Sequence, residues 1–148
     1  MRRSFEILSL NVSERVGERK KPVTTGRVTL RESHGILGDA HAGDWQRQVS
    51  LLASEDINTM RGQGIEIGYG DFAENITTRG VELPALAVGT RLHLGEAVVE
   101  ITQIGKECHE HCAIFRAVGD CVMPRRGVFA RVIRGGEVSR DSGCYYDL

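Results

Sequence analysis

The sequence predicts a mainly β fold, either a β-barrel or a β-sandwich, with one or two short helices. Several short segments alternate apolar with polar residues, as half-buried strands do, and frequent glycines separate these segments. Strands do not alternate regularly with helical segments, which disfavours a parallel α/β fold. At 148 residues the chain has the size of one ordinary domain, so we expect residues 1–148 to form a single domain.

The N-terminal part is expected to contain two strands joined by a charged loop. Residues 5–12 alternate apolar and polar side chains, and residues 23–30 resume that alternation with a break at Gly26. Residues 13–22 between them are charged and have no period, which predicts a loop. A charged loop is most often simply solvated, and a ligand-binding role for its basic residues stays open beside that reading.

A glycine-rich loop, one strand and the clearest helix follow. Glycines surround two histidines and an aspartate in residues 34–43, and residues 47–53 have the composition of a strand. Ser54 is expected to cap a helix over residues 55–61, whose acidic first turn suits the positive end of the helix dipole. Gly62 is a suitable residue to end this helix.

The second half of the chain is expected to be organised around a hairpin. Residues 91–94 and 97–104 form its two strands, with a turn at the glycine and glutamate between them. Residues 127–133 predict a further strand. Residues 141–148 resemble a tail, in which Cys144 is expected to have no function.

The composition excludes some classes of partner. Lys and Arg total 19 against 20 for Asp and Glu, so no net field attracts nucleic acid or an anionic membrane. The N-terminus has no apolar signal core, and no apolar run approaches membrane-spanning length. We therefore expect a cytoplasmic protein with reduced thiols and with no nucleic-acid or membrane partner. A homo-oligomer is compatible with the sequence.

A short segment, residues 103–112, combines two thiols, two imidazoles, a lysine and two carboxylates. A thiolate is a strong nucleophile and a soft metal ligand, and neighbouring cations favour it over the thiol. Cys108 and Cys112 have such neighbours in Lys106 and His109. Buried cysteines also serve as small hydrophobic residues, so a packing role stays open beside a chemical one. Because the segment follows an expected strand, Cys108 is predicted to lie at the rim of a rigid scaffold.

Polar residues elsewhere are candidates for holding a ligand near that cysteine. The glycines of residues 34–43 permit close backbone approach to a ligand, although a plain surface turn has the same composition. Residues 75–79 carry amide, hydroxyl and guanidinium groups that suit an oxyanion or the edge of a heterocycle, and such residues also cap turns. The expected cofactor-binding residues are Lys21, Arg27, Asp39, His41, Arg47, Asn75, Thr77 and Arg79.

Six fragments, in order along nearly the whole chain, resemble the MOSC family, whose members are similar to the C-terminal part of molybdenum cofactor sulfurases. The fragments are GDAHAG at 38–43, RQVSLL at 47–52, GDFAENITTRGVEL at 70–83, VGTRLHLG at 88–95, IGKECH at 104–109 and GVFARVIRGG at 127–136. The resemblance implies a closed β-barrel-like fold and a role in handling sulfur or the molybdenum cofactor. No single fragment is specific by itself, whereas the ordered set is.

The resemblance also suggests roles for individual residues. The family cysteine falls on Cys108, and the asparagine on the cofactor side falls on Asn75. In sulfurase relatives, the domain is thought to receive sulfur from a pyridoxal-phosphate-dependent desulfurase. In the similar mitochondrial amidoxime-reducing component, the cysteine ligates molybdenum. Two features depart from the family: residues 105–107 replace a segment that often contains proline, and Cys112 with His111 has no counterpart in the catalytically studied branch.

Three hypotheses remain open at this point. In the first, Cys108 accepts sulfur as a persulfide from a separate cysteine desulfurase and passes it to a molybdenum-pterin or another metal–sulfur acceptor, with Cys112 as resolving thiol and His109 as proton shuttle. This is a sulfurtransferase activity that uses pyridoxal phosphate only through the partner. In the second, Cys108 ligates molybdenum and basic residues contact the pterin phosphate, as in an oxidoreductase component. The third is a small structural or sensory zinc protein, which the absence of paired ligand spacings disfavours.

Overall fold

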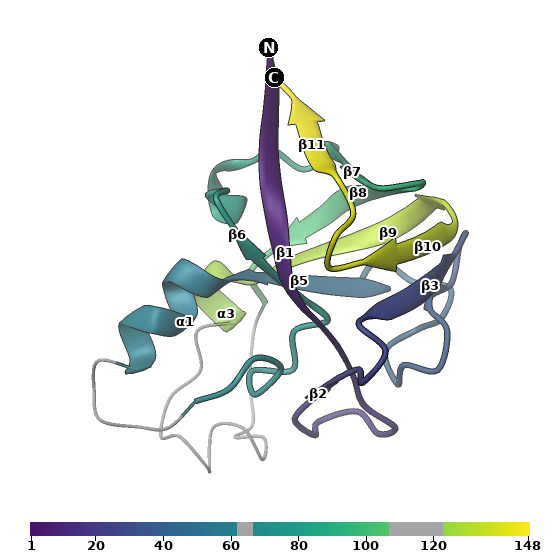
Figure 1. Ribbon diagram of the computed structural model, residues 1–148, viewed down its shortest axis with the longest axis vertical. Helices are drawn as coiled ribbons and strands as arrows, with labels where there is room; N and C mark the ends of the chain where they lie inside the picture. Colours follow the sequence, from purple (N-terminus) through teal and green to yellow (C-terminus); the bar gives the residue numbers. More distant parts are fainter. Residues whose placement is uncertain (62–66, 107–122) are drawn as a thin grey trace.

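The protein is a closed β-barrel, and the computed structural model describes residues 1–61, 67–106 and 123–148 (Figure 1). The barrel strands, in order around the ring, are β1 (Arg2–Val12), β6 (Ile76–Arg79), β5 (Val49–Ala53), β9 (Val128–Arg134), β8 (Ala97–Ile104), β7 (Arg91–Leu94) and β11 (Cys144–Asp147). Closure occurs where β11 pairs with β1 as well as with β7. The predicted fold class, a mainly β barrel with short helices, is therefore confirmed.

Smaller elements decorate the barrel. A short strand, β2 (Lys21–Pro22), extends the sheet beyond the end of β1. A separate small sheet has the order β10, β3, β4. Its strands are β10 (Gly136–Ser139), β3 (Arg27–Arg31) and β4 (Gly35–Ile36). The helices are α1 (Ser54–Arg61) and α3 (Met123–Arg126), with a 3-10 turn at Leu83–Ala85. Within the described ranges, no helix combines the length and the apolar character needed to cross a membrane.

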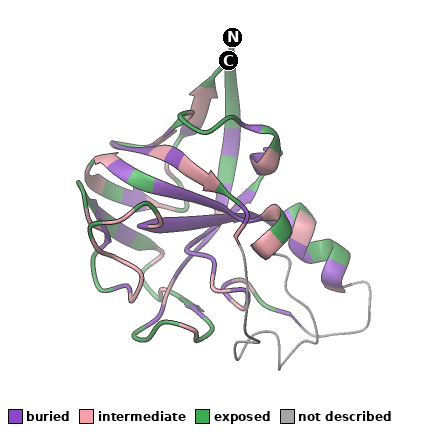
Figure 2. Ribbon diagram, turned by 180° about the vertical axis from the view of Figure 1, so that it is seen from behind, coloured by how far each residue is buried: buried purple, intermediate pink, exposed green. Residues whose placement is uncertain are grey.

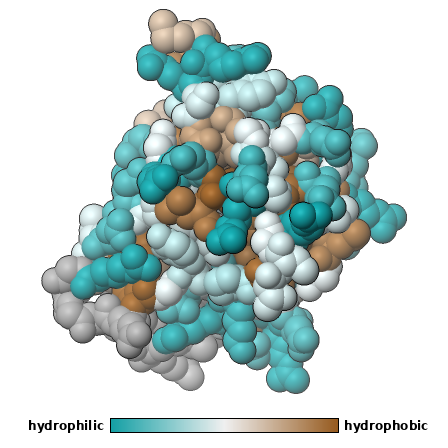
Figure 3. Space-filling model, viewed as in Figure 1, coloured by the Kyte–Doolittle hydropathy of each residue, from teal (hydrophilic) through white to brown (hydrophobic). Residues whose placement is uncertain are grey.

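Two apolar clusters hold the fold together. The larger one fills the barrel, where strands such as β5 are buried at every residue because both of their faces are covered (Figure 2). The smaller one lies beneath α1 and includes Ile57, Phe72, Met123 and Phe129. Met123 is thus a packing residue. Outside these clusters, hydrophilic side chains cover much of the surface, with hydrophobic atoms showing between them (Figure 3).

The hairpin and most strands follow the sequence pattern closely. Strands β7 and β8 pair antiparallel from Arg91↔Glu100 to Leu94↔Ala97, and Gly95 makes the turn with a φ of 61°. That left-handed conformation favours glycine, which is why the sequence signal was clear. Strand β3 shows strict alternation of exposed and buried residues, although it begins at Arg27 rather than at residue 23.

The prediction of a C-terminal tail was wrong. Residues 144–147 form β11, whose register runs from Arg2↔Asp147 to Phe5↔Cys144 beside the start of β1 (Figure 1). The two termini meet there, since the Met1 ammonium donates to the carbonyl of Leu148 at 3.1 Å. The segment is too short and too polar to show alternation, and only the pairing with a strand at the other end of the chain makes it regular.

Candidate functional site

Strand β8 precedes the cysteine-rich segment in the sequence, and the two residues that follow the strand are held by backbone hydrogen bonds. The amide of Gly105 donates to the carbonyl of Gly127 at 2.7 Å, and the amide of Lys106 donates to the carbonyl of Pro124 at 3.1 Å. Gly105 has a φ of 69°, and a Cβ there would lie 2.5 Å from the carbonyl oxygen of Pro124, so only glycine allows this approach. These contacts hold residues 105–106 against residues 124–127.

The predicted catalytic residues Cys108, His109 and Cys112 lie outside the described residues. Their roles as nucleophile or metal ligand, proton shuttle and resolving thiol therefore stay predictions. Cys121 lies outside the described residues as well. Within the described ranges, no group of three or more His, Cys, Asp or Glu side chains is arranged to hold a metal ion.

A buried ion pair lies at the centre of the described part of the site. The Lys20 ammonium donates to Oδ1 of Asp39 at 2.7 Å, and both side chains are 0% exposed. Lys20 also donates to Oγ of Ser13 at 3.1 Å and to Nδ1 of His41 at 2.9 Å. Burial disfavours a charged Asp39, but the hydrogen bond and the charge of Lys20 outweigh it and hold the pKa of Asp39 below its ordinary value.

The local backbone explains how a lysine reaches this depth. The amide of Lys20 donates to the carbonyl of Gly70 at 2.8 Å, which ties the charged loop to the segment before β6. A Cβ on Gly70 would lie 2.4 Å from the Lys20 carbonyl oxygen, and the φ of Gly70 is 90°. Asp39 is oriented by the amides of Ser13 and His41, each at 3.1 Å from a carboxylate oxygen. Two loops that are distant in sequence therefore meet through one buried charge pair.

His41 connects the buried pair to the surface. Its ring is half-buried and stacks parallel to Trp45 with centroids 6.5 Å apart, and the Trp45 indole donates to the carbonyl of His41 at 2.8 Å. Burial, and then the positive charge of Lys20, lowers the pKa of His41 to about 4, with further lowering by the charges of Lys106 and Arg47. The imidazole is neutral at physiological pH and lies within the field of three cations.

Arg47 supplies a guanidinium that no described residue neutralises. Its Cζ lies 4.6 Å from the centroid of Trp45 and 5.6 Å from that of Phe129, in cation–π contact with both rings. Its Nε is buried and has no hydrogen-bond partner among the described residues. Because an unpaired buried donor is costly, this atom is suited to an acceptor brought by a ligand. We call His41, Arg47 and Lys106 the cation rim, since the charges of Arg47 and Lys106 both act on the His41 ring.

Asn75 and Thr77 lie deeper, where the protein itself satisfies them. Asn75 accepts hydrogen bonds from the amide and hydroxyl of Ser50 at 2.9 and 3.1 Å, and its Nδ2 donates to the carbonyl of Asn11 at 3.1 Å. The hydroxyl of Thr77 donates to Oε2 of Glu74 at 2.8 Å. These bonds hold β6 against β5 and β1, so both residues support the wall behind the buried pair.

Glu74 is a further buried acid that the sequence did not reveal. Its side chain is 0% exposed, and burial raises its pKa to about 7, although hydrogen bonds from Gly70 and Thr77 oppose the shift. Its charge acts on Lys20 and favours the ammonium form there. A carboxyl that titrates near neutrality therefore lies close to the buried ion pair.

Three predicted basic residues lie on exposed surfaces. Lys21 is exposed on β2, one residue from the buried lysine. Arg27 pairs with Glu137 across the small sheet at 3.4 Å, and Arg79 pairs with Glu6 across β6 and β1 at 2.6 Å. The structure thus brings together Asp39, His41 and Arg47, with Asn75 and Thr77 behind them, and places Lys21, Arg27 and Arg79 apart in the solvent. Lys20 was missed because a run of two lysines gives no sign of which one is buried.

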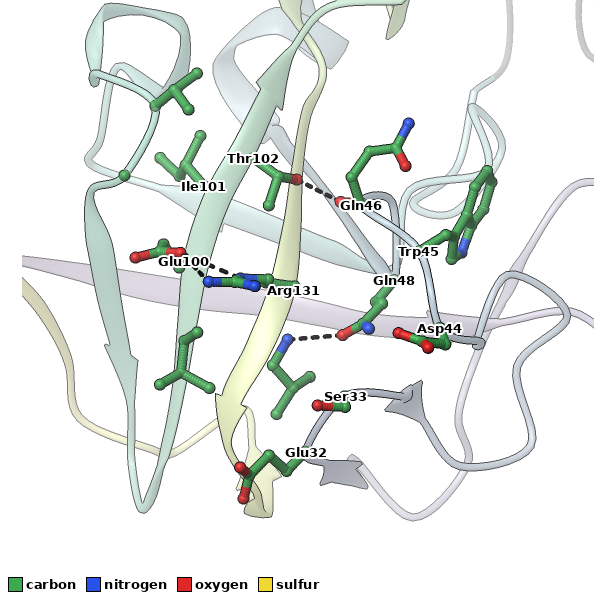
Figure 4. A pocket seen from close by; sticks show the side chains of 14 residues that line it. Glu32, Ser33, Asp44, Trp45, Gln46, Gln48, Glu100, Ile101, Thr102 and Arg131 are labelled. Carbon is green, nitrogen blue, oxygen red and sulfur yellow. Dashed lines mark hydrogen bonds and ion pairs between the residues drawn. The ribbon is translucent and has the colours of Figure 1, made fainter.

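A separate open hollow lies over β8 and β9 and shares Trp45 with the site (Figure 4). Its volume is about 570 Å³. Glu100 and Arg131 face each other across it at 3.0 Å, and Gln48 accepts from the amide of Val132 at 2.9 Å. These polar groups satisfy one another, whereas Arg47 does not find an acceptor among the described residues. The cation rim is therefore the better candidate for a ligand site.

The barrel and this site define the class of protein. The MOSC domain family model matches residues 38–143, which is most of the chain, and the protein belongs to the MOSC domain family. This family is generally linked to functions related to molybdenum cofactor sulfurases.

Solved structures of other proteins show the same architecture. The YuaD protein from Bacillus subtilis superposes with a TM-score of 0.79 at 17% identity, over 99% of this chain and 97% of that one. YiiM from Geobacillus stearothermophilus gives a TM-score of 0.73 at 19% identity, over 97% of this chain and 75% of that one. YiiM from Escherichia coli gives 0.71 at 17% identity, over 99% and 70%. At these identities, the likeness concerns the fold. A search of curated proteins found no match.

Proposed function

We propose that this protein is a sulfur carrier in molybdenum cofactor metabolism, in which Cys108 receives sulfur as a persulfide from a pyridoxal-phosphate-dependent cysteine desulfurase. One observation carries the proposal: Lys106, two positions before Cys108, acts electrostatically on His41 together with Arg47. The residues that follow β8 and precede Cys108 in the sequence therefore include a cation that acts on the same imidazole as Arg47. The family membership supports the same reading.

The transfer is a displacement at sulfur that needs no external oxidant. The thiolate of Cys108 attacks the terminal sulfur of a persulfide on the desulfurase, a new S–S bond forms, and the donor's S–S bond breaks with its electron pair leaving on the donor cysteine. The product is a persulfide on Cys108 and a thiolate on the donor. A nucleophilic sulfur of the acceptor then attacks the terminal sulfur, the S–S bond on Cys108 breaks with its electron pair leaving on Cys108 as thiolate, and the acceptor keeps the transferred atom as sulfane sulfur.

The cation rim favours the ionised forms that this chemistry needs. A thiolate and a persulfide anion are both stabilised by nearby cations in a partly desolvated place. Arg47 has an unused buried donor, and Lys106 belongs to the segment that leads to Cys108. His109 and Cys112 are proposed as proton shuttle and resolving thiol, and the partner is proposed to be a separate cysteine desulfurase in the cytoplasm.

Sulfur uptake is tested with the full chain, a purified cysteine desulfurase, pyridoxal phosphate and isotopically labelled cysteine. Intact-mass measurement is expected to show one added sulfur that dithiothreitol removes. Cys108→Ser is expected to abolish it, whereas Cys144→Ser, which alters a buried thiol on β11, is expected to retain it. Labelling that survives in Cys108→Ser, or no uptake by the wild-type chain, refutes the proposal.

A second candidate is a module that binds the molybdenum cofactor, and the unpartnered Nε of Arg47 favours it. The residues fit the group: Arg47 and Lys106 would hold the pterin phosphate, and Cys108 would offer the thiolate ligand. Bound cofactor would supply a redox-active metal. The chain's own residues would bind the phosphate, and the stacked Trp45 would exclude water from one side.

Cofactor binding has a direct readout in the fluorescence of oxidised pterin released from the purified protein. Arg47→Ala and Cys108→Ser are each expected to lower the pterin content. Arg79→Ala is the matched control, because Arg79 is an exposed arginine engaged with Glu6. Equal pterin content in Arg47→Ala and Arg79→Ala would contradict this second candidate.

A further inference from the structure

The ammonium of Lys20 is surrounded by three acceptors, as many as it has hydrogens to donate. They are Oδ1 of Asp39 at 2.7 Å, Nδ1 of His41 at 2.9 Å and Oγ of Ser13 at 3.1 Å. A protonated amine has three donors and no acceptor, so the arrangement matches the charged form. The carboxylate of Asp39 at hydrogen-bond distance compensates the buried charge.

The direction of the bond to His41 follows from this. Because Lys20 has only hydrogens to offer, Nδ1 of His41 must accept, and an imidazole nitrogen that accepts carries no hydrogen. The neutral ring then has its hydrogen on Nε2. Nε2 lies on the opposite side of the ring from the buried ammonium and has no hydrogen-bond partner among the described residues.

We propose that Lys20 and Asp39 are positioning residues that hold His41 as a neutral Nε2–H donor, and that this donor binds an anionic oxygen or sulfur of the ligand at the cation rim. The inference rests on the proposed function, since it assigns the ligand-binding role of that same site. It defines the chemistry of the ligand group as an anion, either phosphate-like or a sulfur anion.

The charges around His41 agree with a donor that is itself uncharged. The cationic groups that act on the ring are Lys20, Arg47 and Lys106, and Asp39 is the one anion among the described residues that does so. The charge of Asp39 partly offsets them, with an effect on the pKa of His41 that is smaller than that of Lys20 and larger than those of Lys106 and Arg47. A positive charge on the His41 ring would be repelled by the ammonium of Lys20, whereas a neutral N–H donates a directed hydrogen bond without that cost.

This assignment separates His41 from two other roles. A nitrogen that carries its hydrogen is not a metal ligand or a general base, and Nδ1 is occupied by Lys20. The stacked Trp45 fixes the plane of the ring, so the donor direction is set in advance. Preorganised donors of this kind bind anions without the cost of ordering at the moment of binding.

Long-range ¹H–¹⁵N NMR of the uniformly labelled wild-type chain tests the tautomer directly. The His41 signals, assigned by their loss in His41→Gln, are expected to show a protonated Nε2 and a bare Nδ1 from pH 8 to pH 5. A hydrogen on Nδ1, or titration at the ordinary pKa of histidine, overturns the proposal. In Lys20→Met, the single tautomer is expected to give way to a mixture, and an unchanged tautomer there would show that Lys20 does not position the ring.

Anion binding supplies a second test that does not need the Lys20 variant to fold. Trp45 is the one tryptophan of the chain, so its fluorescence reports on inorganic phosphate and on thiosulfate at the cation rim. His41→Gln retains a neutral N–H and is expected to bind within about threefold of wild type, whereas His41→Leu is expected to lose about tenfold. Equal binding by His41→Leu and wild type overturns the donor role.

The two proposals fail in different ways. If the tautomer is wrong, sulfur uptake by Cys108 in the desulfurase assay is unaffected and only the role of His41 is lost. If sulfur uptake fails while the tautomer and the His41-dependent anion binding hold, the site is an anion site without sulfur-carrier function.

Discussion

Replacing Lys20 by Met removes the ammonium that compensates the fully buried carboxylate of Asp39. Both members of the Lys20–Asp39 pair are 0% exposed, so solvent does not screen the remaining Asp39. Breaking a buried pair from one side costs about 3–5 kcal/mol of unfolding free energy, because an uncompensated charge stays inside. Methionine matches the lysine side chain as far as Cε and lacks only the terminal nitrogen position, so lost packing contributes little. We expect Lys20→Met to lose about 3–5 kcal/mol at pH 7.

Urea denaturation followed by circular dichroism measures this loss, and Lys21→Met is the matched control. Lys21 is the neighbouring lysine and is exposed, so its substitution is expected to change stability by less than about 0.5 kcal/mol. The pH dependence identifies the cause. In wild type, the depressed pKa of Asp39 gives stability that is present above its ordinary value of 3.8 and lost as pH falls below it.

In Lys20→Met, the pKa of Asp39 is expected to rise instead, so the carboxyl becomes neutral on acidification and the penalty shrinks. The stability difference from wild type should therefore be larger at pH 8 than at pH 5. A difference that does not depend on pH, or a loss no greater than that of Lys21→Met, would refute the assignment of a buried ion pair.

Three further outcomes follow from two buried groups and from the strand that closes the barrel. Burial raises the pKa of Glu74 from its ordinary 4.5 to about 7, so the unfolding free energy of wild type falls as pH rises through that window. In urea titrations, the stability of Glu74→Gln relative to wild type should therefore increase by on the order of 3 kcal/mol between pH 4 and pH 8. A difference between the two proteins that stays constant with pH would contradict this. Burial raises the pKa of Cys144 to about 12, so iodoacetamide at pH 8 should leave it unmodified in the native protein and label it in urea, as read by peptide mass mapping. Deleting residues 144–148 removes β11 and opens the barrel, so cooperative thermal unfolding should be lost. Deleting Leu148 alone should preserve the cooperative transition. A cooperative transition in the longer deletion would show that the closure of the barrel is dispensable.

Local signals were sufficient for several elements. The β7–β8 hairpin was predicted to the residue because alternation ends at Gly95, whose positive φ is a local requirement of the turn. Helix α1 was predicted because the capping serine, the acidic first turn and the glycine that follows the helix lie within one segment, and the helix begins at Ser54. In both cases, the interactions that determine the structure are made by residues near one another in the chain.

Other elements depend on contacts between distant residues. Residues 75–79 were predicted to hold a ligand or to cap a turn, and no strand was predicted there, although residues 76–79 pair with β5 on one side and β1 on the other. Its threonines are buried because two other strands cover them. Such pairing gives a short polar segment its regular structure, and the residues of the segment by themselves do not predict a strand.

The sequence by itself determined the β class, the family resemblance and the hairpin whose second strand precedes Cys108 in the chain. It also directed attention to Asp39, His41 and Arg47. Only the tertiary structure decided that Lys20 is buried rather than Lys21, that Arg27 and Arg79 pair on the surface, and that β11 closes the barrel. The physical reason is that burial and charge compensation depend on which loops and strands meet in space, whereas turns and alternation are properties of neighbouring residues.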